Sequence, residues 1–188
     1  MYPNTAKEKW FSEEQYAEIL DNLVIVCVDT LVKDRSGKIL LGKRQKFPIK
    51  DWWIFGGRMF AHENYSAASK RGLTRELGFI PHNEPSMIGY YDLVWEIREE
   101  PPQKNGCHVV LAAMEYILSP EDQLSINVNN EHSYLGWFSR GELESMSLHP
   151  TLVKIINDSW ALHLTQEEVF PHSPKPSRYR LPFKKSLA

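Results

Sequence analysis

The chain has 188 residues, of which 42% are hydrophobic, and this is enough for a single globular domain with a substantial core. Its 22 basic and 24 acidic side chains give a formal net charge of −2, which argues against a general nucleic-acid or membrane-surface binder. No apolar run approaches the length of a membrane-spanning helix, and the polar start MYPNTAKEKW does not resemble a signal peptide, so we expect a cytoplasmic protein. The two cysteines, Cys27 and Cys107, lie in apolar runs and are expected to be free thiols.

The first part of the chain predicts a helix followed by a hairpin. Ser12 and Gln15 have the spacing of a capping box, which begins a short helix ending near Asp21. Two β-rich segments, 23–33 and 38–44, flank a turn that contains Gly and Asp, and this pattern is typical of a hairpin.

The rest of the chain predicts a strand meander with one helix inside it and another at its end. The expected elements are strands at 52–55, 86–97, 106–118 and 131–138, and helices at 63–77, from Ser139 and at 151–164. We divide the chain into an N-terminal helical segment (1–21), one main domain (22–165) and a basic C-terminal tail (166–188).

One spacing in the predicted helix 63–77 indicates a function. Gly57 is followed after five residues by Glu63, and Glu63 after seven residues by Arg71. Glu63 is expected at the start of the helix, where an acidic group favours the dipole and could pair with Arg71. This frame, closed by Gly78, resembles the Nudix box, Gx5Ex7REUxEExGU, where U is a bulky aliphatic residue. The resemblance covers roughly residues 22–160 and implies an α/β fold, the Nudix α/β/α sandwich with a mixed β-sheet.

Two acidic positions of the usual box are lost in this chain. Positions 72, 75 and 76 are related as i, i+3 and i+4, so their side chains share one face of a helix. All three are Glu in the usual box, where they suit Mg²⁺ or Mn²⁺ held together with substrate phosphates. Here they are Gly72, Arg75 and Glu76, so a single carboxylate remains. One carboxylate can anchor one Mg²⁺, but it would hardly support a cluster of several ions.

The same acidic positions are lost in a Nudix subgroup, the GDP-mannose mannosyl hydrolases. The segment 56–63 also resembles that subgroup, because an Arg directly follows the double glycine. That resemblance implies a nucleoside-diphosphate sugar as substrate, either GDP-mannose or GDP-glucose. Water would attack the anomeric carbon of the sugar and expel the nucleoside diphosphate. It further implies Mg²⁺ as cofactor (with Mn²⁺ possible) and a homodimer, with no nucleic-acid or membrane partner.

The resemblance also implies which residues form the metal site and the base. The backbone carbonyl of Gly56 and the carboxylates of Glu76 and Glu131 would hold Mg²⁺ together with the diphosphate, with Glu131 standing where the family has Gln. His132 would be the general base, because an imidazole has a pKa suited to taking a proton near neutrality.

Five further residues match positions of the subgroup's site. Arg44 and Arg58 would meet the phosphates or the loop bearing His132, because a guanidinium forms paired hydrogen bonds to phosphate oxygens. His108 stands where the family has a Tyr that touches the leaving phosphate, and it could donate the same hydrogen bond. Asp29 and Arg71 match positions near the sugar.

Two other hypotheses remain open from the sequence. The chain could cleave a P–O bond in a nucleotide sugar or nucleoside triphosphate, with Glu131 or Glu115 replacing the lost carboxylates. It could instead be a catalytically inactive Nudix domain that binds a nucleotide sugar as a sensor.

Overall fold

The structure is a computed structural model that describes residues 11–127 and 132–168. Glu131 and the basic tail from residue 169 onward lie outside the described residues. Among those that are described, no helix is both long and apolar enough to cross a bilayer.

A seven-stranded mixed sheet forms the centre of the fold. Strand β1 (Ile25–Lys33) pairs in parallel with β6 (Cys107–Ile117), and β5 (Ser86–Trp95) is antiparallel to β6 at the edge. The other side of β1 pairs antiparallel with β2 and β4, and β2 in turn pairs with β3 and β7. The bounds of these four strands are β2 (Ile39–Arg44), β3 (Trp52–Trp53), β4 (Phe55–Arg58) and β7 (His132–Phe138).

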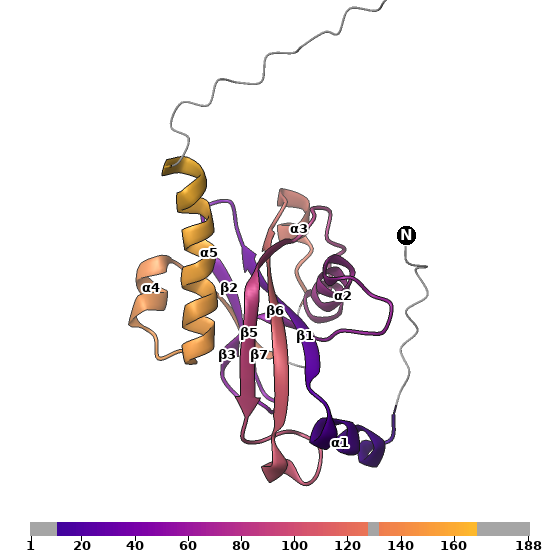
Figure 1. Ribbon diagram of the computed structural model, residues 1–188. Coiled ribbons are helices and arrows are strands. Elements are labelled where there is room, and N and C mark those ends of the chain that lie inside the picture. The colour runs from indigo at the N-terminus through magenta and orange to yellow at the C-terminus, as the bar shows by residue number, and fades with distance from the viewer. Residues whose placement is uncertain (1–10, 128–131, 169–188) are drawn as a thin grey trace, which may run out of the picture.

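Helices cover both faces of this sheet (Figure 1). Helix α2 (Tyr65–Leu77) packs against β1 and β4 on one face, whereas α5 (Pro150–Glu168) packs against β5 on the other, beside the short α4 (Arg140–Ser145). Helix α1 (Glu13–Asn22) lies across one end of the sheet, near the start of β6. This arrangement confirms the α/β/α sandwich with a mixed sheet.

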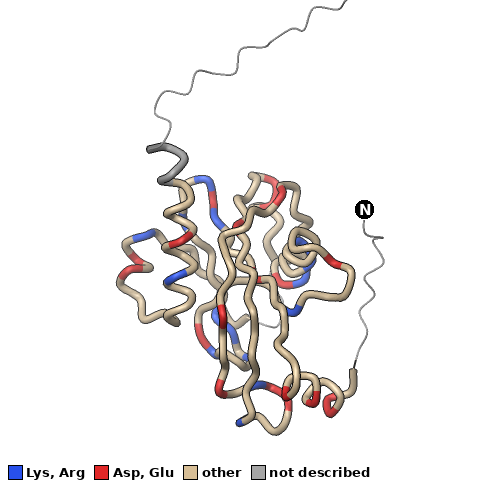
Figure 2. Tube along the Cα trace, viewed as in Figure 1, with Lys and Arg blue, Asp and Glu red and all other residues tan. Residues whose placement is uncertain are grey.

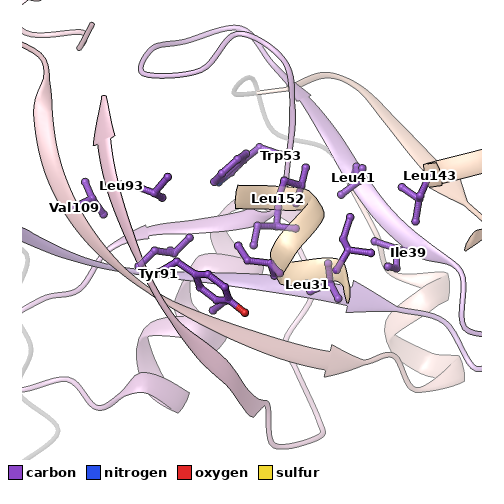
Figure 3. Packing of buried hydrophobic residues seen from close by; sticks show 14 residues of the cluster. Leu31, Ile39, Leu41, Trp53, Tyr91, Leu93, Val109, Leu143 and Leu152 are labelled. Carbon is purple, nitrogen blue, oxygen red and sulfur yellow. The ribbon is translucent and has the colours of Figure 1, made fainter. Parts of the chain in front are cut away.

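The two faces have separate hydrophobic cores. The larger core, shown in Figure 3, packs Trp53, Tyr91 and Leu93 of the sheet against Leu152 of α5. On the opposite face, Leu73 and Leu77 of α2 pack against the sheet and are fully buried. Both faces are therefore apolar, so the strands in the middle of the sheet contain few polar residues.

Most of the predicted elements are confirmed, and the capping boxes predicted at Ser12 and Ser139 are present. The predicted strand 52–55 is divided into β3 and β4. The segment after the predicted strand 106–118 contains a short helix, α3 (Pro120–Leu124), capped by Ser119. The segment between the predicted strands 86–97 and 106–118 contains a 3-10 turn, η1 (Gln103–Asn105).

Helix α2 begins two residues later than predicted, because Asn64 caps it. The Asn64 side chain accepts a hydrogen bond from the Ala67 N–H at 2.8 Å. Glu63 therefore lies outside the helix, where it accepts from the Phe60 N–H at 2.8 Å and pairs with Arg71 at 2.5 Å. The predicted Glu63–Arg71 pair is confirmed, but it fixes the loop before the helix rather than the first helical turn.

Gly72 lies where α2 approaches β4 most closely. A Cβ atom at this position would be 3.0 Å from the Cα of Gly56. The intrinsic helix preference for alanine over glycine cannot explain a glycine in mid-helix, but this close approach does. Gly72 brings the helix backbone next to the double glycine of β4, and thereby positions Glu76 and Arg75 against Gly56.

This close approach predicts that Gly72→Ala lowers the free energy of unfolding by about 1–3 kcal/mol, because the added methyl group overpacks the contact with β4. Chemical denaturation measures the effect. Gly141→Ala in α4 is the matched control, because a Cβ there meets nothing within 4 Å. The control should leave stability unchanged or raise it slightly, as helix preference requires. Equal stabilisation by both changes would contradict the close approach.

Candidate functional site

A cavity of about 340 Å³ opens at the end of the sheet that α1 covers. Cys27, Asp29 and Val109 of the central strands line it, and so do Tyr16 and Leu20 of α1. A second cavity of about 330 Å³ adjoins it and shares Tyr16, Arg58 and Arg75 as lining residues. Their sizes are in the range of natural small-molecule sites.

Four arginines among the described residues line the first cavity: Arg44 of β2, Arg58 of β4, Arg75 of α2, and Arg98 of the loop after β5, whose guanidinium is bound by Asp21. The acidic Asp29, Glu99 and Glu100 line it as well. Arg44 lies at an irregularity in the pairing of β2 with β7, and its buried Nε has no hydrogen-bond partner among the described residues. The guanidinium of Arg58 lies over the ring of Tyr16, 4.7 Å from its centroid. Figure 2 shows basic and acidic residues interspersed along the chain. The three guanidinium groups other than that of Arg98 favour an anionic ligand with several oxygens.

Asp29 is a buried carboxylate on the cavity wall. Trp53 donates a hydrogen bond from Nε1 to the Oδ2 of Asp29 at 2.9 Å, and the Asp29 backbone pairs with Gly56 across the β1–β4 ladder. Burial raises the pKa of Asp29 to about 6, although the Trp53 hydrogen bond opposes this shift. That Asp29 takes part in substrate binding remains a prediction.

Glu76 and His132 lie behind the cavity and form a buried pair. Glu76 is fully buried, and its Oε2 lies 2.9 Å from the Nε2 of His132. The His132 ring contacts Phe55 on one side, and a Cβ on Gly42 would fall 2.4 Å from its Nδ1, so only glycine fits beside it. Neither residue lines the cavity. The second ring nitrogen of His132, Nδ1, is buried and has no hydrogen-bond partner among the described residues, so water in the cavity does not reach the ring as it is placed.

The predicted metal ligands Gly56 and Glu76 are brought together, but a side chain lies between them. Nη2 of Arg75 donates to the Gly56 carbonyl oxygen at 2.6 Å and to Glu76 Oε1 at 2.5 Å. The Gly56 N–H donates to the same Oε1 at 3.0 Å. Glu131, the third predicted ligand, lies outside the described residues, and no group of three acidic, His or Cys side chains within them could hold a metal. As arranged here, the described residues do not fit a divalent ion.

His108 and Arg71 lie away from the first cavity. His108 is on the opposite sheet face from Cys107 and Val109, and its Nε2 lies 2.5 Å from Asp92 Oδ1. Arg71 holds Glu63 and donates to the backbone oxygen of Arg58 at 2.9 Å, so it positions the strand that bears Arg58. It also lines the second cavity.

Glu115, one of the two alternative carboxylates, is in a different part of the molecule. It is 4% exposed and pairs with Lys33 at 2.5 Å, and Ser159 and His163 of α5 bind it as well. Burial would raise the pKa of Glu115, but the hydrogen bonds from these three groups lower it below its ordinary value. Its position and its partners give it a structural role.

The sequence predicted no binding role for Arg98 or Arg75, which both line the cavity. Arg98 is 1% exposed, binds Asp21 of α1 at 2.7 Å and Gly106 O at 3.1 Å, and so fixes α1 against the cavity. Trp53 and Trp95 also reach the cavity, with their rings 5.6 Å apart. The sequence indicated position 75 only as a place where the usual Glu of the box is replaced. The spacing of the box shows which helix face it occupies, but not that its guanidinium turns back onto Gly56.

Comparison with known proteins identifies the class. The family model described as the NUDIX domain matches residues 24–158, so the chain belongs to the NUDIX domain family. This class is the Nudix hydrolases, which act on nucleoside diphosphate derivatives and generally use a divalent metal ion such as Mg²⁺.

Solved structures with the same fold include bacterial and archaeal members. A MutT NUDIX hydrolase from Burkholderia pseudomallei is 23% identical, with a TM-score of 0.59 over 73% of this chain and 98% of that one. A MutT protein from Methanosarcina mazei Go1 is 17% identical, with a TM-score of 0.57 over 75% and 95% of the two chains. The NUDIX domain of Shewanella oneidensis NrtR, solved with ADP ribose, is 15% identical, with a TM-score of 0.57 over 78% and 97%. At these identities the likeness shows the fold.

Proposed function

We propose that this protein hydrolyses a nucleoside-diphosphate sugar at the anomeric carbon, with GDP-mannose and GDP-glucose as the first substrates to test. The observation that supports this most is the grouping of Arg44, Arg58 and Arg75 around one cavity that also has aromatic walls. Arginines are suited to a diphosphate, and the apolar end of the cavity is suited to a base or a sugar ring.

Attack of water at the anomeric carbon suits a cavity that is lined by several arginines. Water adds its oxygen to the anomeric carbon while the bond from that carbon to the β-phosphate oxygen breaks, and the bonding electrons leave with the nucleoside diphosphate. Guanidinium groups stabilise the charge that builds on the leaving oxygen. Attack at phosphorus in this family instead uses several carboxylates and metal ions, and Glu115 is committed to Lys33.

The reaction also needs a base on the cavity wall. The sequence predicts His132, and that remains a prediction. The geometry favours Asp29, because its carboxylate lines the cavity while the His132 ring is enclosed behind Glu76. Asp29 would take the proton of the attacking water as that water bonds to carbon.

A second candidate function is binding without turnover. The engagement of both Glu76 oxygens by Gly56, Arg75 and His132 favours it, because these contacts leave no carboxylate on α2 free to act. In the NrtR structure the NUDIX domain holds ADP ribose, so a Nudix fold of this kind can bind a nucleotide sugar.

A panel of nucleotide sugars, assayed with Mg²⁺ and with EDTA, tests the proposal. Free sugar plus an intact nucleoside diphosphate is the expected product pair. Sugar phosphate plus nucleoside monophosphate would show P–O cleavage and contradict it. Saturable binding without product from any sugar in the panel would favour the binding module.

A further inference from the structure

We infer that the guanidinium of Arg75 takes the place of the divalent ion, so that the site binds the diphosphate of its ligand without metal. This inference rests on the proposed function, because it concerns the same cavity and the same diphosphate. It goes beyond that function because the positive charge beside α2 would come from the protein itself and not from a metal ion.

The geometry of Arg75 supports this directly. One nitrogen, Nη2, lies between the Gly56 carbonyl oxygen and Glu76 Oε1, at 2.6 Å and 2.5 Å. These are the two oxygens that the family resemblance assigns to the metal. Mg²⁺ would need to approach both oxygens within about 2.0–2.1 Å. The guanidinium nitrogen occupies the space between the two oxygens that such an ion would need. Both contacts are charge-assisted hydrogen bonds, the strong class in proteins.

The neighbours of Glu76 hold this arrangement in place. Glu76 is fully buried, with Oε1 bound by the Gly56 N–H and Oε2 by His132. A buried carboxylate needs a nearby positive charge, and Arg75 adjoins it in sequence and in space. Gly72 allows the helix to approach Gly56 closely enough for this contact. The buried carboxylate and the glycines thus position the cation.

The rest of the Arg75 side chain reaches the ligand space. Arg75 lines both cavities, and 44% of its side chain is exposed. Arg44 and Arg58 line the first cavity together with it. A diphosphate bound there would meet guanidinium groups where other Nudix proteins present a metal ion.

Calorimetric titration of GDP, and of ADP as a second probe, into the full-length protein tests the inference. The wild type should bind one of these nucleotides with dissociation constants that agree within about threefold in Mg²⁺ and in EDTA. Arg75→Ala should weaken binding in EDTA about tenfold or more, and Mg²⁺ should restore part of it by reaching the freed oxygens.

Lys70→Ala is the matched control. Lys70 is on the same helix, pairs with Glu84 and lines neither cavity, so its loss should leave both dissociation constants unchanged. A thermal melt of each variant separates loss of binding from loss of fold. Binding by the wild type in Mg²⁺ but not in EDTA would overturn the inference and leave the proposed function intact. Failure of both nucleotides to bind under either condition would overturn both.

Discussion

Replacing Glu115 with Gln should lower the free energy of unfolding by about 3–5 kcal/mol, because it leaves the Lys33 ammonium buried without its counter-charge. Lys33 and Glu115 are 5% and 4% exposed, and their charged atoms are 2.5 Å apart. Ser159 and His163 of α5 bind the same carboxylate, so the loss also loosens α5 from the sheet. Chemical denaturation at neutral pH measures the change.

The pH dependence gives an independent check on Glu115. Its pKa in the folded protein lies below its ordinary value of 4.5, so its contribution to stability is present above that value and lost as the pH falls through the folded pKa. The wild type should therefore lose stability below about pH 4.5, and Glu115→Gln should lose less over the same range. The double change Lys33→Met with Glu115→Leu should recover much of the single loss. A single-variant effect below about 1 kcal/mol would contradict the buried pair.

Replacing Asp29 with asparagine should lower turnover of the accepted nucleotide sugar by about 10²–10⁴-fold, the usual contribution of a positioned base. Asparagine has nearly the same shape, and its side-chain oxygen can still accept the hydrogen bond from Trp53. Binding of the nucleoside diphosphate should change little, because the arginines remain. Steady-state kinetics combined with calorimetric titration separate the two effects.

The same variant should become more stable than the wild type at alkaline pH. Burial raises the pKa of Asp29 from 3.8 to about 6, so the folded state is favoured below the unfolded value and loses this advantage as the pH rises through the folded pKa. The neutral asparagine amide would carry no such cost above that pH. His108→Ala is the matched control, because His108 lies on the opposite sheet face beside Asp92 and should leave turnover within about twofold. Full turnover in Asp29→Asn would exclude Asp29 as the base and return the role to His132.

The sequence predicted the layout of the fold because its local signals agreed with its packing. Capping residues such as Ser12 and Ser139, and apolar strands bounded by turns, indicate each element without any knowledge of its neighbours. The predictions differed from the structure where a contact that the sequence does not reveal determines the local structure. Asn64 displaced the start of α2, and the proximity of Gly56 explains why position 72 is glycine.

The candidate site was predictable in part for the same reason. The family resemblance predicted that Gly56 and Glu76 lie together, and it predicted Arg44, Arg58 and Asp29 as residues of one substrate site; the structure places the first two in contact and the other three around one cavity. Spacing alone could not give the direction of a side chain. Through tertiary contacts, His132 turns inward to Glu76, His108 turns to the other face, and Arg75 turns back onto Gly56.

The fate of isotope from labelled water tests the central claim most directly. Hydrolysis in H₂¹⁸O of the nucleotide sugar that the protein accepts, followed by mass spectrometry of both products, shows which atom water attacks. We expect ¹⁸O in the free sugar and none in the nucleoside diphosphate, because attack occurs at carbon. Label in a phosphate product would show attack at phosphorus and contradict the account.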